Sequence, residues 1–348
     1  MRRAALALTV AVSLALVTIA TPAEAANYRY GRKTGDTGGV LVLIEGGLYN
    51  PRNTDAVVAT VESIEDFGGG TNQSMPVLPV WDEEVAGRAG LGYAWGAGQR
   101  VMASYWSFSA KQSSAGDGPG SGRLHFAVGP PIFSGGQYVG DNATPGFYSL
   151  ETEVEAEVVD VEWSRSYDAS ESFELGWSLG LRYATYTETT QGVYDEASSL
   201  SPSLGRVSYA AFKINESEAF GARVAGRGSF GIGGGFSVDG EIGLSLLDNQ
   251  IDSLSRLAPI GSDNQPTTSV ARATAFDDGR SGTIFDVELT LAWTAARDAL
   301  RFYGGWRQSV WDEITRDLVR NFPGTSAPLE DRSSVTFSGY VLGVAFRL

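Results

Sequence analysis

The sequence contains no cysteine and a single histidine, His125, among its 348 residues. The absence of cysteine excludes disulfide bonds, zinc–thiolate and iron–sulfur sites, and a cysteine nucleophile. One histidine also excludes most sites that need several imidazoles, so we expect no metal and no other cofactor. A folded chain of this size without disulfides has to be held by burial or by a closed hydrogen-bonded ladder.

The sequence also has no internal run of about 18 or more apolar residues, which excludes a helical membrane protein. Its formal net charge of −15 argues against nucleic acid as a partner, because phosphate binding needs a basic surface. Aromatic residues make up 11% and there are 44 glycines. This composition favours an all-β fold.

The N-terminal residues have the pattern of an export signal. Arg2 and Arg3 precede an apolar run, and Ala23-Glu24-Ala25 is a small-x-small cleavage site. We predict a signal peptide over residues 1–25 and one mature domain over residues 26–348. The expected location is the outer membrane of a Gram-negative cell.

Hydrophobic residues recur with a period of two, most clearly over Glu174–Tyr186. Leu175, Trp177, Leu179, Leu181 and Tyr183 share one face, and Gly176, Ser178, Gly180, Arg182 and Ala184 share the other. Alternation over about ten residues is typical of one tilted membrane strand. The same pattern, clean or weaker, covers 38–49, 85–95, 99–110, 147–166, 219–230, 236–246, 285–293, 300–310 and 333–348.

Short and long connections separate these strands alternately. The short turns are 96–98, 168–171, 231–235 and 295–298, and the long polar segments are 50–82, 111–146, 187–218, 248–281 and 312–332. The pattern predicts an all-β transmembrane antiparallel up-and-down β-barrel with short periplasmic turns and long extracellular loops. Ten strands are counted, and twelve if Val207–Lys213 or Ala56–Ser63 adds a hairpin.

Aromatic residues cluster near the strand ends, which predicts two girdles at the lipid headgroups. One would hold Tyr93, Trp95, Trp163, Trp293 and Phe346, and the other Tyr49, Trp106, Phe108, Tyr183 and Tyr340. The alternative is ordinary cross-strand aromatic pairing in a soluble sheet. Tyr340–Leu348 alternates to the carboxyl end and resembles the C-terminal insertion signal of outer-membrane barrels, although it ends in Leu rather than Phe. We therefore expect outer-membrane lipid and the barrel assembly machinery as partners.

Charged residues on the inward faces are the candidate functional residues. The predicted pore-lining residues are Arg88, Glu155, Glu157, Asp160, Glu162, Arg182, Arg223, Arg227, Asp239, Glu241, Asp286, Glu288, Arg307 and Arg347. Charges at membrane depth must face water or each other. They either line a water-filled pore or form salt bridges that close a narrow lumen. Placing Glu155, Glu157 and Asp160 on one face requires a bulge near Val158-Val159.

A catalytic interpretation has little support. Gly176-Trp177-Ser178-Leu179-Gly180 matches the G-x-S-x-G elbow of serine hydrolases, but that motif needs a strand-to-helix turn and a histidine base. Ser178 lies inside the cleanest strand, and His125 lies in a distant polar segment. We predict a protein without enzymatic activity and keep a hydrolase that uses either residue as a minor alternative.

Several stretches resemble the Legionella-type major outer-membrane protein family. They are Trp81–Phe108 (WDEEVAGRAGLGYAWGAGQRVMASYWSF), Val158–Trp163 (VVDVEW), Glu174–Ala184 (ELGWSLGLRYA) and Gly221–Leu247. The resemblance implies a pore-forming or surface-exposed barrel without enzymatic activity, in which Asp160 and Arg182 are structural lumen charges.

Two functions follow from these patterns. The first is a porin-like barrel that passes small hydrophilic solutes or ions, with a mild preference for cations. The second is a plugged structural barrel whose long loops, 50–82, 111–146 and 248–281, act as an adhesin or receptor surface. The sequence leaves open whether the protein forms a homo-oligomer.

Overall fold

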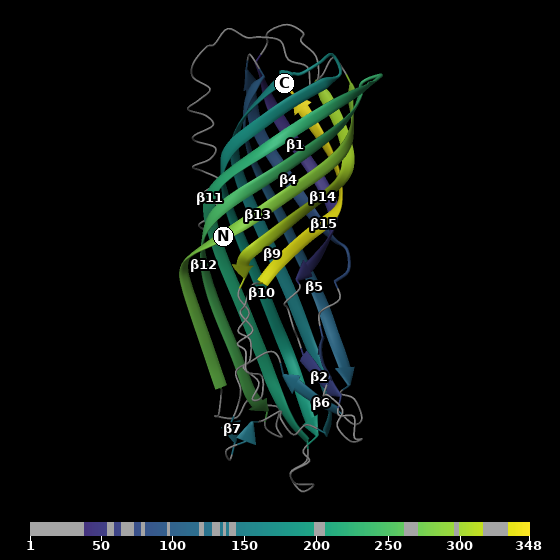
Figure 1. Cartoon of the computed structure of the whole chain (residues 1–348). Coiled ribbons are helices and arrows are strands. Elements are labelled where there is room, and N and C mark those ends of the chain that lie inside the picture. Colours follow the sequence, from purple (N-terminus) through teal and green to yellow (C-terminus); the bar gives the residue numbers. More distant parts are fainter. Residues whose placement is uncertain are drawn as a thin grey trace.

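Ten long antiparallel strands form a closed barrel in the computed structural model (Figure 1). The strands follow one another around the barrel in chain order, each paired with its sequence neighbours, which is the up-and-down topology predicted. The structure describes residues 38–53, 59–63, 73–77, 81–95, 98–117, 122–126, 133–134, 137–138, 144–197, 206–260, 271–295, 299–315 and 333–348. The predicted signal peptide lies outside these residues.

The order around the barrel is β1-β15-β14-β13-β12-β11-β10-β9-β5-β4. The barrel strands are β1 Gly39–Asn53, β4 Glu84–Trp95, β5 Gln99–Asp117, β9 Thr144–Asp168, β10 Phe173–Ala197, β11 Arg206–Gly233, β12 Phe236–Ile260, β13 Ala271–Ala295, β14 Leu300–Thr315 and β15 Ser333–Arg347. The ten-strand count is confirmed. Val207–Lys213 belongs to β11 and adds no hairpin.

The first and last strands close the barrel. β1 pairs with β15 from Leu41 opposite Arg347 to Asn53 opposite Val335. At the end of this ladder the backbone of Val40 and that of Leu348 exchange two hydrogen bonds of 3.1 and 2.9 Å. Closure pairs every strand on both sides and leaves no open edge, which is the condition for a sheet to cross a bilayer.

Short turns join the strands at one end of the barrel. The tightest connects β11 to β12, where Gly233, Gly234 and Gly235 have φ angles of 108°, 62° and 86°. Residues that have a Cβ atom rarely adopt these backbone angles, so the turn requires its glycines. The chain terminus Leu348 lies at this same end, and the strand ends that flank the longer connections lie at the other (Figure 1). The predicted asymmetry of the connections is confirmed.

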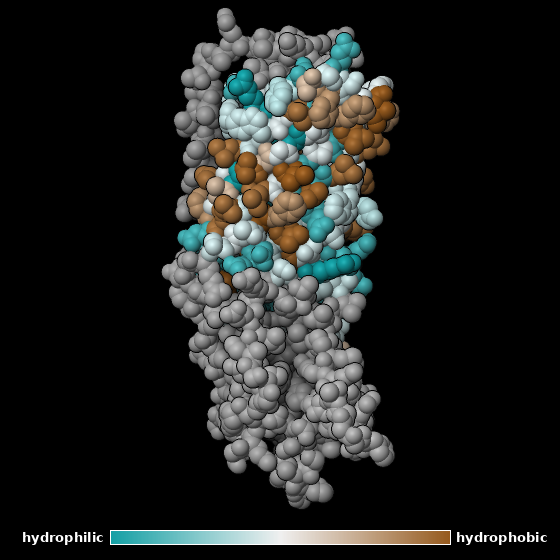
Figure 2. Space-filling model, in the orientation of Figure 1, coloured by the Kyte–Doolittle hydropathy of each residue, from teal (hydrophilic) through white to brown (hydrophobic). Residues whose placement is uncertain are grey.

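An apolar band surrounds the half of the barrel next to the short turns. The outward residues of β12 in this band run from Phe236 to Leu246 and are 36–62% exposed. Eleven residues at about 3.3 Å each, tilted by about 45°, span about 25 Å, the height of the lipid-facing band of membrane barrels. Figure 2 shows the band on one face, with polar side chains above and below it. The exterior is that of a transmembrane β-barrel.

Aromatic residues form the predicted girdle at the short-turn edge of the band. Trp163 packs against Trp177 with ring centroids 5.0 Å apart, and Trp293 stacks on Phe302 at 6.0 Å. At the opposite edge the girdle prediction is partly wrong. Tyr183 and Tyr340 face outward, whereas Tyr49, Trp106 and Phe108 point into the barrel, because their strand parity faces them inward.

Five strands continue well beyond the apolar band, and for four of them, β10 to β13, the sequence predicted loops there. β9, β10, β12 and β13 have 25 residues each and β11 has 28. In this extension the faces exchange character. On β10, Ala184 and Tyr186 are buried inside, while Thr185 and Thr187 lie on the outer face. The predicted loops 187–218 and 248–281 are therefore largely barrel wall.

Small sheets accompany the barrel at the end with the longer connections (Figure 1). β2 (Ala59–Ser63) pairs with β3 (Gln73–Val77) and with β6 (Gly122–Phe126), and β7 (Phe133–Ser134) pairs with β8 (Gln137–Tyr138). The segment 56–63 therefore adds no barrel strand. In the described part of the chain, no helix is long and apolar enough to cross a membrane.

Candidate functional site: the interior of the barrel

A layer of ion pairs occupies the interior at the level of the apolar band. Arg182 on β10 donates two hydrogen bonds to Asp160 on β9, Nε to Oδ1 at 2.7 Å and Nη2 to Oδ2 at 2.9 Å. Its Nη1 donates to Oδ2 of Asp286 on β13 at 2.7 Å. Because β13 lies three strands from β10, this arginine links distant parts of the wall. A two-pronged arginine–carboxylate pair is among the strongest charged contacts in proteins.

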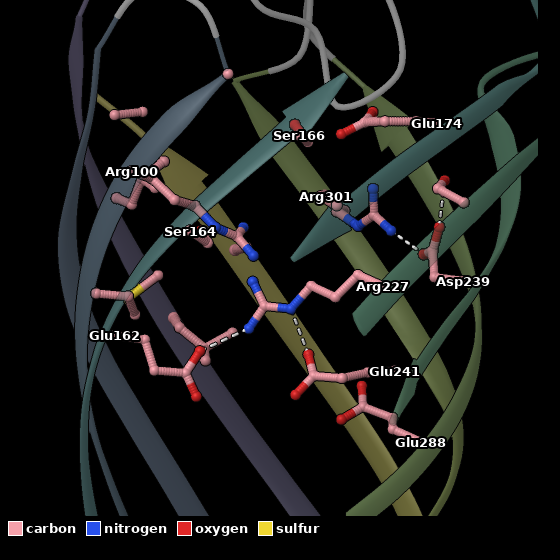
Figure 3. Close-up of a pocket in the computed structure, with 18 of the residues that line it drawn as sticks. Arg100, Glu162, Ser164, Ser166, Glu174, Arg227, Asp239, Glu241, Glu288 and Arg301 are labelled. Carbon is pink, nitrogen blue, oxygen red and sulfur yellow. Dashed lines mark hydrogen bonds and ion pairs between the residues drawn. The ribbon is translucent and has the colours of Figure 1, made fainter. Parts of the chain in front are cut away.

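Arg223 on β11 extends this layer. It forms ion pairs with Glu162, with Glu241 at 2.8 Å and with Asp286 at 3.2 Å. Arg227 lies four residues further along β11 on the same face. It contacts the same two glutamates, Glu162 at 2.9 Å and Glu241 at 2.5 Å (Figure 3). Two arginines thus share two carboxylates between β9 and β12.

The opposite wall carries the same type of contact. Arg307 on β14 pairs with both Glu45 on β1 and Glu288 on β13, and the Tyr303 hydroxyl donates to Glu45 at 2.7 Å. Nearer the short turns, Arg301 pairs with Asp239. The layer is called the ionic layer below, and consists of Glu45, Asp160, Glu162, Arg182, Arg223, Arg227, Asp239, Glu241, Asp286, Glu288, Arg301 and Arg307.

The ionic layer has to be paired because it is buried. Asp160, Arg182 and Arg223 are 4–5% exposed. Removing a charge from water costs about several kcal/mol per ion unless an opposite charge and hydrogen bonds replace its hydration. The alternation of acidic and basic strands provides that replacement. Most of the predicted lumen charges are therefore paired with one another.

An aromatic plug lies next to the ionic layer, on the side away from the short turns. We use this name for Tyr49, Trp106, Phe108, Tyr186, Trp311 and Phe337. Trp106 lies at its centre, with ring centroids 5.8 Å from Tyr49, 6.4 Å from Trp311 and 5.6 Å from Phe337. The Trp311 and Phe337 rings pack edge to face at 5.2 Å, the geometry that aromatic pairs prefer.

The residues of the plug come from opposite walls of the barrel and meet in its interior. Trp106 on β5 and Trp311 on β14 come from strands four places apart in a ring of ten, close to the full diameter. Tyr186 on β10 reaches the same Trp311 from the other direction, at 6.5 Å. Every one of the ten strands contributes a residue to the hydrophobic core around the plug.

Two cavities inside the barrel are lined by described residues. The larger, about 250 Å³, reaches the short-turn end, and its lining includes Gly98, Ser166, Glu174 and Arg347. The smaller, about 60 Å³, lies deeper, between the ionic layer and the plug, with Trp106 and Phe337 in its lining. Arg88, Glu241, Glu288 and Arg307 line both cavities. The smaller cavity therefore lies against the rings of the plug, and the larger one lies nearer the short turns.

The sequence placed most lumen charges on the correct face but misplaced two. Of the predicted residues, only Glu155 and Glu157 lie on the outer face. Thr152, Val154, Ala156, Val158 and Asp160 are all buried inside, so β9 keeps one parity through this region. Its pairing with β5 and β10 is continuous here, so the predicted bulge at Val158-Val159 is absent.

Two residues that form contacts of the ionic layer, Glu45 and Tyr303, were not predicted from the sequence. Glu45 follows the apolar residues Leu41–Ile44, where both faces of β1 look alike. The face of Tyr303 was likewise undetermined, because its neighbours Phe302, Gly304 and Gly305 show no alternation of polarity. The rule that an ionisable group at membrane depth faces the interior would have identified Glu45.

The misplaced glutamates belong to an acidic outer wall beyond the apolar band. Its carboxylates are Glu151, Glu153, Glu155 and Glu157 on β9, Glu216 and Glu218 on β11, and Asp248 and Asp252 on β12. At the boundary the Tyr105 hydroxyl donates to Glu157 at 2.7 Å. Tyrosine with its ring on the band and its hydroxyl on a polar group is typical of a membrane interface.

Lys111 is one of the few cations on this wall. Its ammonium contacts Glu151 at 2.8 Å. The hydrogen bond from Lys111, followed by that from Gln191, lowers the pKa of the Glu151 carboxyl, and the same contact with Glu151 raises the pKa of Lys111. Both side chains are well exposed, so solvent screens the pair and it contributes little stability.

The described residues offer no assembled catalytic or metal site. Ser178 is buried on the inner face of β10 near the short turns, without a hydrogen-bond partner for its hydroxyl in the described part of the chain. His125 lies on β6, at the other end of the molecule (Figure 1). The structure does not bring the two together. Groups of three or more metal-ligating side chains are also absent among the described residues.

No protein-family model matches this sequence, and no curated protein matches it either. Solved structures with a similar fold include the outer membrane protease OmpT from Escherichia coli, at 10% identity and a TM-score of 0.49, over 89% of this chain and 97% of that one. A major outer membrane protein from Thermus thermophilus is 11% identical, with a TM-score of 0.32 over 90% and 100% of the two chains. The Ralstonia pickettii toluene transporter TbuX is 10% identical, with a TM-score of 0.29 over 90% of each. Likenesses at this level carry no information on activity.

Proposed function

We propose that this chain is an outer-membrane barrel with a sealed lumen, whose wall outside the membrane is a binding surface for a cationic macromolecule. The observation that carries the proposal is the aromatic plug, to which strands on opposite sides of the barrel contribute. The apolar band and the predicted signal peptide support the location.

An open porin is the less favoured function. Porins of 16–18 strands hold an aqueous channel, whereas barrels of about eight strands are filled by side chains. This ten-stranded barrel has an ionic layer and then a hydrophobic layer across its lumen. Hydrophobic constrictions exclude ions because water does not wet them. Pore formation, which the family resemblance implies, would need the plug to move.

The outer wall supplies the binding surface. Eight carboxylates lie on the outer faces of β9, β11 and β12 beyond the apolar band, and Lys111 and Arg256 are the cations among the described outer-face residues of β5, β9, β11 and β12 there. β9 is joined to β11 through β10, and β11 is paired with β12, so the charges are held on a rigid scaffold. A fixed acidic surface attracts cationic partners and accelerates their encounter at low salt.

The sealed lumen predicts the absence of conductance. Purified refolded protein, shown to be folded by an unboiled gel band that migrates faster than the boiled one, is inserted in planar bilayers. We expect no discrete current steps, and no osmotic swelling of liposomes in small sugars. Regular steps from protein of this purity would overturn the sealed barrel and restore the porin.

The acidic wall predicts charge-dependent binding. Proteoliposomes are tested for binding of polylysine, with polyglutamate as the negative probe. Replacing Glu153, Glu155, Glu157 and Glu216 with glutamine is expected to weaken polylysine binding at least tenfold at low salt. The lumen carboxylate Glu45 is not mutated in this variant. A matched control neutralises the exposed carboxylates Asp82, Glu83, Asp168 and Glu171, which lie outside the acidic wall. Equal loss in both variants would contradict a specific wall.

A further inference from the structure

The larger cavity differs in charge from the molecule that contains it. The chain carries a net charge of −15. The cavity lining is instead close to neutral, with six carboxylates and seven arginines, of which Arg165 projects from the outward face of β9. The cations are Arg88, Arg100, Arg165, Arg227, Arg301, Arg307 and Arg347, and the anions are Glu45, Glu162, Glu174, Asp239, Glu241 and Glu288. All the cations are arginines, whose planar forks match carboxylate and phosphate oxygens.

Two of these arginines point toward each other across the cavity. Arg100 comes from β5 and Arg227 from β11, three strands away, and Figure 3 shows their guanidinium groups facing one another. Arg100 Nε donates to the Ser164 hydroxyl oxygen at 2.9 Å, which fixes the direction of its fork. Two cations that face each other repel, and the repulsion is strong where little water screens it.

Arg227 has a nitrogen available for a ligand. Its Nε is bound to Glu241 at 2.5 Å and its Nη2 to Glu162 at 2.9 Å. The remaining nitrogen, Nη1, points toward Arg100 in Figure 3, and the described residues give it no hydrogen-bond partner. The two glutamates are themselves shared with Arg223, so each of them pairs with two guanidinium groups.

We propose that the cavity binds a small oxyanion, a carboxylate or phosphate group, between the guanidinium groups of Arg100 and Arg227. Such an anion accepts hydrogen bonds from both forks and removes their repulsion. The cavity volume of about 250 Å³ is below the range of ordinary drug-sized pockets, about 300–1,000 Å³, and suits a small molecule. The plug closes the other side, so the anion enters and leaves at the short-turn, periplasmic end. This site does not depend on the binding surface proposed for the outer wall.

Direct binding to folded protein in detergent tests the site. Isothermal titration with inorganic phosphate and with acetate is expected to show saturable binding that weakens as sodium chloride is added. Arg100→Gln is expected to weaken it at least tenfold, and Arg100→Lys less, because lysine keeps the charge without the fork. The stronger of the two anions identifies the ligand class.

Arg256→Gln is the matched control, because it removes the same charge from the exposed outer face of β12. It is expected to bind both anions as the wild type does. The proposal fails if neither anion binds the wild type saturably, or if Arg256→Gln loses as much affinity as Arg100→Gln.

A second measurement keeps the test valid if Arg100→Gln does not fold. Because the chain has no cysteine, Ser166→Cys places one thiol in the cavity lining, and Thr187→Cys places one on the acidic outer wall. We expect the thiol at 166 to react faster with an anionic than with a cationic methanethiosulfonate, and the thiol at 187 to show the opposite order. A preference for the cationic reagent at both positions would overturn the anion site.

Discussion

Replacing Arg223 with methionine is expected to lower the free energy of unfolding by roughly 3–5 kcal/mol, the cost of breaking a buried ion pair by removing one partner. Arg223 is 4% exposed and contacts Glu162, Glu241 and Asp286. Methionine has a similar length but leaves part of that negative charge buried without compensation. Urea titration of protein in phospholipid vesicles, followed by the fast-migrating unboiled gel band, measures the change.

Two further variants separate charge from packing. Arg256→Met removes an exposed arginine of the same strand pair and should change stability by less than about 0.5 kcal/mol. Adding Glu162→Gln to Arg223→Met should recover most of the loss, because Glu241 remains paired with Arg227 and Asp286 with Arg182. If Arg223→Met unfolds at the wild-type urea concentration, water reaches the ionic layer freely, and the lumen is open rather than sealed.

The membrane-spanning part of the fold was predictable because two solvents act on it. Along β12, the outward Phe236, Ile242 and Leu246 meet lipid, while Asp239 and Glu241 meet the ionic layer. Each residue therefore reports its face by its polarity. The same physical contrast gave the ten strands, the short turns and the direction of most lumen charges.

The part of the barrel beyond the apolar band was not predictable by this rule. There the outer face meets water and the inner face is apolar, which is the reverse of the membrane-spanning part. Leu246 and Leu247 are adjacent, yet Leu246 is 62% exposed to the lipid side and Leu247 is 2% exposed inside. From Leu247 onward the apolar face is the inner one, so the alternation changes phase although β12 continues unbroken to Ile260. A change of phase in the sequence resembles the end of a strand.

Glu155 and Glu157 were misplaced for the same reason. Carboxylates must face inward only at the depth of the hydrocarbon, and these two lie beyond it. The pairing of the ionic layer was also beyond the sequence, since Arg182 and Asp286 are 104 positions apart and meet only through the register of three intervening strand pairs. The patterns gave the type of each inward residue and left its partner undetermined.

Opening the aromatic plug is expected to convert a non-conducting barrel into a conducting one. Trp106→Ala with Phe337→Ala removes two rings that contact each other at 5.6 Å and that line the 60 Å³ cavity. The cavity would then extend into the plug, and the remaining lining of charged and hydroxyl groups is wetted by water. We expect small, discrete current steps in planar bilayers, where the wild type gives none.

The conductance has to come from the folded barrel. Each truncation of a buried aromatic residue costs about 3–5 kcal/mol, so only protein that retains its fast-migrating unboiled band is recorded. Trp106→Phe with Phe337→Leu keeps the lumen filled and should stay silent. Tyr340→Ala with Leu342→Ala removes comparable apolar side chains from the lipid face, where they are 68% and 75% exposed, and should also stay silent. Silence of the folded Trp106→Ala, Phe337→Ala variant would contradict a seal that depends on these two rings. In that case the ionic layer and the four remaining rings, Tyr49, Phe108, Tyr186 and Trp311, together block the passage of ions.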